Sequence, residues 1–383
     1  MQGRIDVDDA VATPQRVALL GSFAPSLINF RGPLIAAMIA RGHQVFAMAP
    51  DIDPETARQL EALGASPVSV PLEQTSLNPF AGARSIGALK RTFARIRPDV
   101  LIAYTIKPIV LGGPAARAAG VPRFVPLVTG LGYAFTEGRE PRRLIARAAA
   151  SLLYRRAFGY SNAAIFQNPD DLSEFHRRRL LPAKLRTAIV NGSGIDLDHF
   201  APVPPPPAPS FLMVARLLGD KGVREYAEAA VRLLERHPQV RISLAGWIDP
   251  SPNAINQAEL DAIVNSGVQF LGRLADVRDA IATHRVYVLP SYREGTPRSV
   301  LEAMAIGRAI ITTDAPGCRE TVIEGENGML VRPRNSDSLY RAMVRFVEQP
   351  ALAEAMGPAS RRLAERKYDV HKINREVLHH SGL

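Results

Sequence analysis

One stretch, Arg285 to Val331, constrains the fold more than any other part of the chain. Its apolar run Val286–Leu289 ends at a proline and predicts a buried parallel strand. We expect a helix from about Ser299 to Ile306, ended by a glycine, and a second strand over Ala309–Thr312. Since open parallel sheets bind ligands at the carboxyl ends of their strands, the loop before the helix is a candidate binding site.

Two carboxylates, Glu294 and Glu302, flank the start of this predicted helix. A helix amino terminus has free N–H groups and a positive dipole end, which suit a phosphate. Both carboxylates can therefore face a ligand held there. A structural alternative is that Ser299 and Glu302 form a capping box, with the glutamate bonded back to the cap residue.

The wider pattern is longer than a helix cap requires. It reads E-G-x-P-x-x-x-x-E-A-M-A-x-G from Glu294, then T-D-x-x-G-x-x-E from Thr313 and N-G-x-L-V from Asn327. This series resembles the signature of the retaining glycosyltransferases of family 4. The resemblance implies an α/β chain with the GT-B fold, in which two Rossmann-like domains face a central cleft.

The same resemblance implies roles for residues of the second domain. Glu294 would contact the donor sugar and Glu302 the ribose, while the backbone at Gly295, Thr296 and Pro297 would shape the phosphate site. The family pattern R-L-x-x-x-K-G is matched from Arg216 to Gly222, so Arg216 and Lys221 would stabilise the leaving diphosphate. Arg273, in a G-x-x-x-D-V corner, is a candidate for contact with the nucleotide base.

In the first half of the chain, Asn29 and Arg31 lie in the loop after the first predicted strand. By resemblance this loop faces the cleft, so both are candidates for acceptor or phosphate contact. They are equally compatible with ordinary polar loop positions. Where many family members have a histidine, this chain has Thr129-Gly130-Leu131-Gly132. This stretch, together with Thr105–Pro108, is similar to a subgroup that glycosylates sugars linked to polyprenyl diphosphate.

The length of 383 residues favours two domains. We expect a flexible tail over 1–14, an acceptor-side domain over 15–200 and a Pro-rich linker over 201–210. The nucleotide-sugar domain would follow over 211–360, and a helical tail over 361–383 would cross back to the first domain. The linker contains APVPPPPAP, the clearest break in the chain.

The net charge of +10 is concentrated in one region. Between Arg117 and Val190 there are 13 Lys/Arg and 5 Asp/Glu, a net of +8. A basic helix there alternates with apolar residues and favours an anionic membrane surface; its arginines are Arg142, Arg143, Arg147, Arg155 and Arg156. The alternative is a helix packed on its own domain with a solvated basic face. No aromatic platform accompanies the basic run, so we expect no nucleic-acid partner.

Several features exclude other classes of protein. A single cysteine rules out an intrachain disulfide and a Cys-rich zinc site. No run reaches about 18 uninterrupted apolar residues, and the first fourteen residues do not resemble a secretory signal. Asp51 and Asp53 imitate a D-x-D metal motif but precede Pro54, so we interpret Asp53 as a helix cap. We predict no metal and no cofactor.

Together these features predict a retaining glycosyltransferase. It would move a hexose or N-acetylhexosamine from a UDP-sugar to a polyprenyl-diphosphate-linked saccharide, in the cytoplasm at the inner face of the cell membrane. Two alternatives stay open. One is a UDP-sugar epimerase of the same fold, and the other is a non-catalytic basic protein that binds membrane or nucleic acid.

Overall fold

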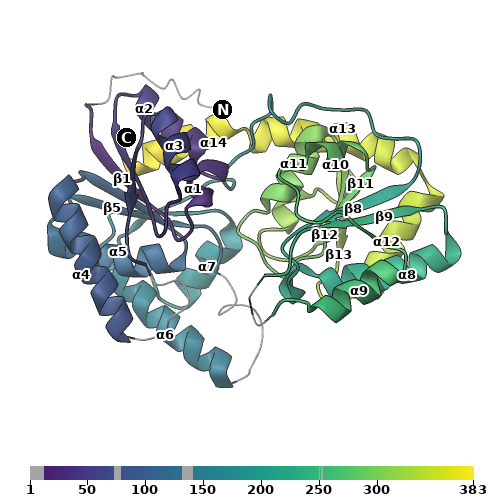
Figure 1. Ribbon diagram of the computed structural model, residues 1–383, viewed down its shortest axis with the longest axis horizontal. Coiled ribbons are helices and arrows are strands. Elements are labelled where there is room, and N and C mark those ends of the chain that lie inside the picture. Colours follow the sequence, from purple (N-terminus) through teal and green to yellow (C-terminus); the bar gives the residue numbers. More distant parts are fainter. Residues whose placement is uncertain (1–12, 73–78, 132–140, 250, 252) are drawn as a thin grey trace.

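The chain folds into two α/β domains that lie side by side, each built on one parallel sheet (Figure 1). The computed structural model describes residues 13–72, 79–131, 141–249, 251 and 253–383. The first sheet has seven strands in the order β3-β2-β1-β4-β5-β6-β7. Their bounds are β1 Arg16–Leu20, β2 Gln44–Ala49, β3 Ser66–Ser69, β4 Val100–Tyr104, β5 Arg123–Val128, β6 Ala163–Phe166 and β7 Arg186–Ile189.

Helices cover both faces of this first sheet, which explains why its central strands are almost entirely apolar. Val17 and Leu19 of β1 belong to one buried cluster, while Ala18 and Leu20 belong to the cluster on the other side. A parallel strand buried on both faces reads as a continuous apolar run. The helices are α1 Pro25–Asn29, α2 Gly32–Ala40, α3 Pro54–Ala62, α4 Pro79–Ile96, α5 Ile106–Ala119, α6 Pro141–Phe158 and α7 Pro169–Arg177.

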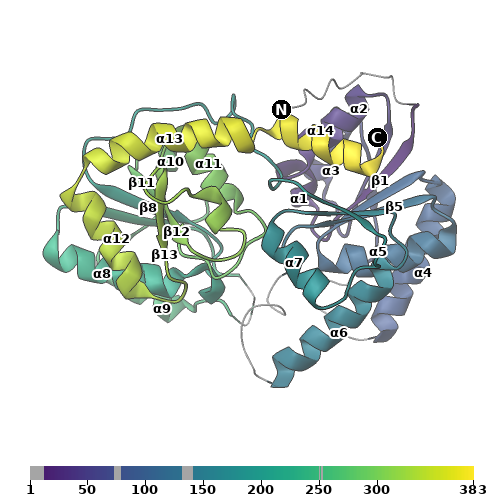
Figure 2. The same cartoon turned by 180° about the vertical axis from the view of Figure 1, so that it is seen from behind.

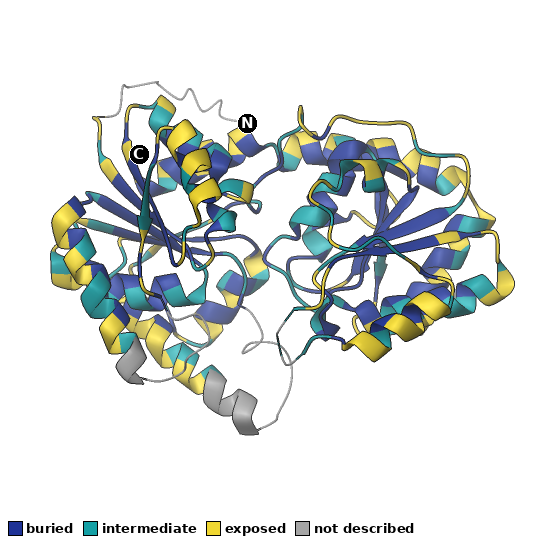
Figure 3. Ribbon diagram, in the orientation of Figure 1, coloured by how far each residue is buried: buried dark blue, intermediate teal, exposed yellow. Residues whose placement is uncertain are grey.

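The second sheet has six parallel strands in the order β10-β9-β8-β11-β12-β13 and surrounds a core of its own. Its strands are β8 Ser210–Val214, β9 Arg241–Ala245, β10 Gln269–Phe270, β11 Val286–Leu289, β12 Ala309–Thr313 and β13 Gly328–Val331. Its helices are α8 Val223–Arg236, α9 Gln257–Asn265, α10 Arg278–Ala282, α11 Arg298–Ile306, α12 Ser336–Glu348 and α13 Ala351–Lys367. In both domains the central strands are buried and the outer helix faces are exposed (Figure 3).

The chain crosses between the domains twice, and the two crossings lie against each other. The first follows β7, and the second lies between α13 and α14 (Val370–Ser381). The Ile195 amide donates to the Tyr368 carbonyl at 2.8 Å, and the Val370 amide donates to the Ile195 carbonyl at 3.1 Å. Helix α14 then packs on α2 and β6 of the first domain, so α13 and α14 together span both domains (Figure 2).

The central strand–loop–helix–strand unit forms as the sequence predicts. The helix, α11, begins one residue before the predicted start and ends at Gly307, whose φ of 86° suits glycine. The predicted cap at Asp53 is also confirmed, because its carboxylate accepts from the Glu55 and Thr56 amides. The loop after β1 holds the short helix α1, which the sequence analysis did not predict. None of the described helices is both long and apolar enough to span a bilayer.

Candidate active site

A cavity of about 500 Å³ lies between the domains, at the carboxyl ends of both sheets. Its lining comes from strand ends and from the loops and helix starts that follow them, so the two parallel sheets together create the site. The first domain contributes Ser22, Phe23, Ser26, Phe30, Arg31, Tyr104, Thr105, Thr129, Gln167 and Ser193. The second contributes Val214, Ala215, Arg216, Lys221, Trp247, Leu289 and the run Glu294–Ser299 with Glu302.

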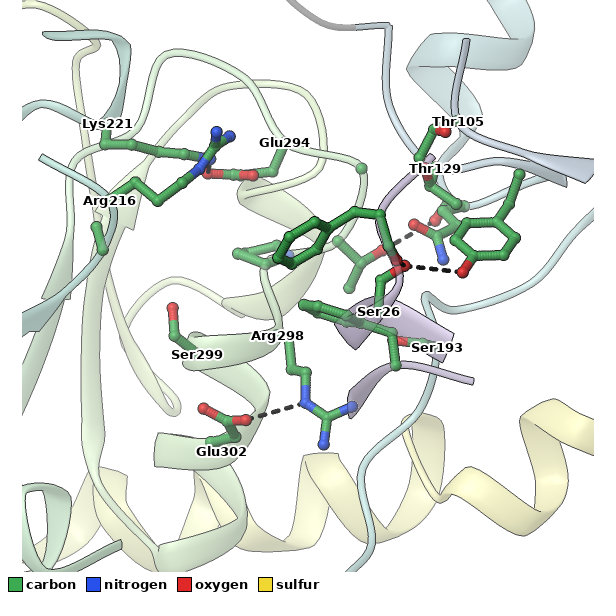
Figure 4. A pocket seen from close by; sticks show the side chains of 18 of the residues that line it. Ser26, Thr105, Thr129, Ser193, Arg216, Lys221, Glu294, Arg298, Ser299 and Glu302 are labelled. Atoms are coloured by element: carbon green, nitrogen blue, oxygen red, sulfur yellow. Dashed lines mark hydrogen bonds and ion pairs between the residues drawn. The ribbon is translucent and has the colours of Figure 1, made fainter. Parts of the chain in front are cut away.

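On the second-domain wall, Lys221 and Glu294 form an ion pair. Lys221 Nζ lies 2.5 Å from Glu294 Oε1, and both side chains are largely buried (Figure 4). Gly222 permits this approach, because a Cβ at that position would lie 2.2 Å from the Pro290 carbonyl oxygen. The loop after β8 therefore packs directly on the loop after β11. A lysine held beside a carboxylate at a helix start can receive a diphosphate and balance its charge.

Arg216 extends the positive charge of this wall. Its Nη1 lies 3.1 Å from Asp249 Oδ2, and its side chain is 49% exposed. The guanidinium is thus held at the cavity edge while remaining accessible to a ligand. In Figure 4 Arg216 and Lys221 lie next to each other, with Glu294 at their tips.

Glu302 pairs with Arg298 and forms no helix cap. Arg298 Nε donates to Glu302 Oε1 at 3.0 Å, one helical turn apart. Burial raises the pKa of Glu302, and the Arg298 guanidinium acts in the opposite direction. The capping box offered as an alternative is absent, because Pro297 takes the cap position of α11 and no side chain bonds there. Glu302 is therefore available to a ligand in the cavity.

Arg298 also connects the two domains. Its Nη1 donates to the backbone carbonyl of Asn29, and its guanidinium lies 5.3 Å from the centre of the Phe30 ring. A side chain that contacts both walls of the cavity is sensitive to domain closure.

The loop after β11 packs against first-domain backbone so closely that only glycine fits. A Cβ on Gly295 would lie 2.2 Å from the Thr129 carbonyl oxygen. Asn168 Nδ2 donates to the Gly295 carbonyl at 2.8 Å, and Thr296 Oγ1 donates to the Gln167 carbonyl at 3.1 Å. Gly295 and Thr296 thus lie at the seam between the domains as well as in the cavity lining.

A buried ion pair supports the same seam. Arg293 pairs with Asp171, whose side chain is fully buried. Burial raises the pKa of Asp171, and the charge of Arg293 opposes that effect. Beside it, Arg319 Nη1 lies 2.7 Å from Asp170 Oδ2. Both pairs join α7 of the first domain to loops of the second, so they hold the domains together on one side of the cavity.

The first-domain wall is rich in hydroxyl groups, with one buried cation. Ser26 Oγ and Tyr104 OH lie 2.8 Å apart, and Thr105 Oγ1 donates to Ser22 Oγ at 2.9 Å. Arg31 is only 4% exposed and its guanidinium lies 4.9 Å from the centre of the Tyr104 ring. Burial lowers the pKa of Arg31 to about 10, so the side chain is still charged at neutral pH.

The cavity brings together most of the residues predicted from the sequence: Arg31, Arg216, Lys221, Glu294, Gly295, Thr296, Pro297 and Glu302. Two predicted residues are not part of its lining. Asn29 is exposed and contributes its backbone carbonyl to Arg298, and Arg273 is exposed and lies over the Trp247 ring at 4.7 Å.

Sequence reasoning missed several lining residues. Arg298 stands at a variable position of the family pattern, so only its spacing of four from Glu302 hinted at an ion pair. Ser22, Thr105 and Thr129 lie just after predicted strands, and that position could have marked them as candidates for the site. Within the described ranges, no group of three or more His, Cys, Asp or Glu side chains could hold a metal ion. Metal independence stays a prediction.

Comparison with known proteins gives each half of the chain a family. Residues 31–192 match the model described as "Glycosyl transferase 4-like domain", and residues 208–349 match "Glycosyl transferases group 1". The first match lies within the seven-stranded domain and the second covers the whole six-stranded sheet.

Relatives resemble the chain over most of its length. It is 28% identical over 351 residues to an N,N'-diacetylbacillosaminyl-diphospho-undecaprenol alpha-1,3-N-acetylgalactosaminyltransferase of Campylobacter jejuni, covering 88% of this chain and 90% of the relative. It is 24% identical to a UDP-Gal:alpha-D-GlcNAc-diphosphoundecaprenol alpha-1,3-galactosyltransferase of Escherichia coli, covering 74% and 75% of the two chains.

Among solved structures, sucrose-phosphate synthase of Thermosynechococcus elongatus superposes with a TM-score of 0.77 at 20% identity, covering 95% of this chain and 97% of the other. This likeness establishes the arrangement of two parallel-sheet domains around a cleft. The family models favour a transferase over the epimerase and the non-catalytic binding protein. The chain therefore belongs to the family 4 glycosyltransferases of the GT-B fold, with the glycosyl transferase 4-like domain first and the group 1 domain second.

Proposed function

We propose that this protein transfers a hexose or N-acetylhexosamine from a UDP-sugar to a saccharide carried on polyprenyl diphosphate, with retention of the anomeric configuration. The observation that carries the proposal is the asymmetry of the cavity. One wall holds Lys221, Glu294 and Arg216, a set suited to a nucleotide diphosphate, and the facing wall presents hydroxyl groups. The names of the two relatives support both substrates, since each acts on a sugar linked to diphospho-undecaprenol.

The proposed retention of the anomeric configuration rests on the state of the carboxylates that line the cavity. The described carboxylates that line the cavity are Glu294 and Glu302, and each is already paired with a cation. Because both carboxylates are held in ion pairs, the proposed step assigns the acceptor proton to the departing phosphate. In the proposed step the bond from the anomeric carbon to the UDP oxygen breaks, and the bond to the acceptor oxygen forms on the same face. The acceptor proton passes to the departing phosphate, and Lys221 and Arg216 stabilise the UDP that leaves.

Exclusion of water is the second requirement, because hydrolysis competes with transfer. The seam at Gly295 and the Arg298 contact to Asn29 hold the walls together around the ligand. A closed cleft also strengthens the charge interactions of Lys221 with phosphate.

The test is UDP release from a panel of UDP-sugars, with and without a polyprenyl-diphosphate saccharide. Lys221→Ala and Glu294→Ala should each lower acceptor-dependent release by about 100-fold or more. Arg58→Ala is the matched control, because its side chain is 73% exposed and lies on α3 away from the cavity. Release that occurs equally without acceptor would contradict the lipid-linked substrate.

We also propose that helix α6 holds the enzyme at the inner face of the cell membrane. Leu152 and Leu153 are 66% and 45% exposed, and Arg155 and Arg156 beside them are exposed too. Tyr154 and Phe158 are buried on the other side of the helix. Exposed leucines next to arginines match an interfacial helix on anionic lipid. The side chains of Arg142 and Arg143 lie outside the described residues, and Arg147 is partly buried.

Vesicle flotation tests this membrane contact. Arg155→Glu/Arg156→Glu and Leu152→Asn/Leu153→Asn should each release the protein from vesicles that contain anionic lipid. Arg58→Glu should stay bound. Binding that both double variants retain would refute the role of α6.

A further inference from the structure

Arg31 is the cation of the cavity that has no counter-charge. Its Nε is buried and has no hydrogen-bond partner among the described residues, and no described carboxylate pairs with it. The other three cations that line the cavity each have a carboxylate: Lys221 has Glu294, Arg216 has Asp249 and Arg298 has Glu302. A buried charge without a partner is costly, so its position on the cavity wall indicates an anionic ligand.

The surroundings of Arg31 add positive charge and supply no negative charge. Tyr104 contacts the guanidinium, but burial raises the pKa of Tyr104, so the phenol stays neutral. The charge of Arg298 acts on Arg31 and opposes its protonation. Helix α2 starts at the next residue, Gly32, with its positive dipole end at Arg31. This combination suits an anion with more than one negative charge.

The position of Arg31 separates this anion from the diphosphate of the donor. Arg31 belongs to the first domain, whereas Lys221 and Arg216 belong to the second. Figure 4 shows Ser26 of the first domain across the cavity from Lys221 and Arg216. Arg31 therefore belongs to the wall opposite the cations of the donor diphosphate.

We propose that Arg31, with Arg298 beside it, binds the diphosphate group of the acceptor. A guanidinium suits this task because its N–H groups can bind two phosphate oxygens at once. Arg31 and Glu294 line the same cavity of about 500 Å³, so an acceptor whose diphosphate is bound at Arg31 can present a hydroxyl group of its sugar to the donor. An acceptor with one sugar on its diphosphate fits this arrangement. This inference rests on the proposed function.

The experiment compares two acceptors that carry the same single sugar, one on a farnesyl diphosphate and one as a neutral octyl glycoside. KM for each is measured on the full chain with the UDP-sugar that wild type uses. Arg31→Met should raise KM for the diphosphate acceptor at least tenfold and reduce the preference over the neutral acceptor by the same factor. Arg31→Lys should recover part of the loss, because lysine restores the positive charge but cannot bind two phosphate oxygens at once as a guanidinium does. Arg58→Met is the surface control.

A binding measurement tests whether Arg31 binds a diphosphate without requiring any catalytic turnover. Geranyl diphosphate is titrated by calorimetry into protein saturated with UDP, which fills the donor site. Wild type should bind it, and Arg31→Met should bind it at least tenfold more weakly. Equal binding, an equal rise in KM for both acceptors, or weaker UDP binding in Arg31→Met would overturn the inference. Loss of geranyl diphosphate binding in Arg31→Met, with no wild-type turnover of any UDP-sugar, would support the site and refute the proposed reaction instead.

Discussion

Replacing Arg31 by methionine should make the unliganded protein more stable. The pKa of Arg31 falls to about 10 because the charged side chain is buried. A folded-state pKa below the unfolded value means that folding disfavours the bound proton. The cost is therefore fully present below about pH 10 and disappears as the pH rises from about 10 towards the ordinary pKa of an arginine. At neutral pH the difference corresponds to about 3 kcal/mol.

Methionine keeps much of the apolar stem but loses the contact of the guanidinium with Tyr104. That cation–π contact stabilises by roughly 1–2 kcal/mol when it is shielded from water. The net expectation for Arg31→Met is a gain of about 1–2 kcal/mol in the free energy of unfolding of the first domain. For a domain of that size, this gain raises Tm by about 2–8 °C.

The assay is thermal and urea denaturation of wild type, Arg31→Met and the surface control Arg58→Met at pH 7.5 and at pH 10.5. The stabilisation should be largest at pH 7.5 and smaller at pH 10.5, where part of wild-type Arg31 is neutral. The control should stay within about 0.5 kcal/mol of wild type at both values. A loss of stability in Arg31→Met of more than about 1 kcal/mol at pH 7.5 would refute the reasoning, because it would mean that the charge is satisfied in the folded protein.

Three further predictions concern the rest of the site. Glu302→Gln should weaken UDP binding by about tenfold in calorimetry, because an amide loses the charge-assisted bond that a carboxylate offers to a hydroxyl. Arg293→Ala leaves the buried Asp171 without its partner and should cost about 3–5 kcal/mol in urea denaturation, and the added change Asp171→Ala should recover part of that cost. Gly295→Ala places a Cβ 2.2 Å from the Thr129 carbonyl oxygen and should expand the protein in small-angle scattering and lower kcat at least tenfold, whereas Gly87→Ala in α4 should do neither.

The sequence was sufficient for the elements whose pattern is local. Val286–Leu289 is a continuous apolar run because both faces of its strand are buried. This pattern can be recognised without knowing which residues pack against the strand. Asp53 caps α3 by accepting from the amides of Glu55 and Thr56, so its role can also be predicted from the local sequence.

The failures come from contacts between residues far apart in the chain. Ser299 and Glu302 have the spacing of a capping box, but Pro297 takes the cap position and Arg298 takes the carboxylate. The partner of Arg298 on the opposite wall is the Asn29 carbonyl, which lies 269 residues away. No local pattern encodes such a contact. The same holds for Gly295, whose need for glycine arises from Thr129 across the seam.

Because the cations of the cavity are paired on one wall and not on the other, binding of the donor and binding of the acceptor should affect the stability of the protein differently. On the second-domain wall Lys221 and Arg216 already have carboxylate partners, so a nucleotide diphosphate there binds cations that the protein has already neutralised. On the first-domain wall Arg31 has none, so an anion there removes an existing cost. For the same number of contacts, a ligand on the acceptor side should therefore raise the free energy of unfolding more than a ligand on the donor side. An acceptor without a diphosphate leaves Arg31 buried and unpaired, which gives the enzyme a physical basis for rejecting a neutral sugar whose hydroxyl groups are otherwise correct.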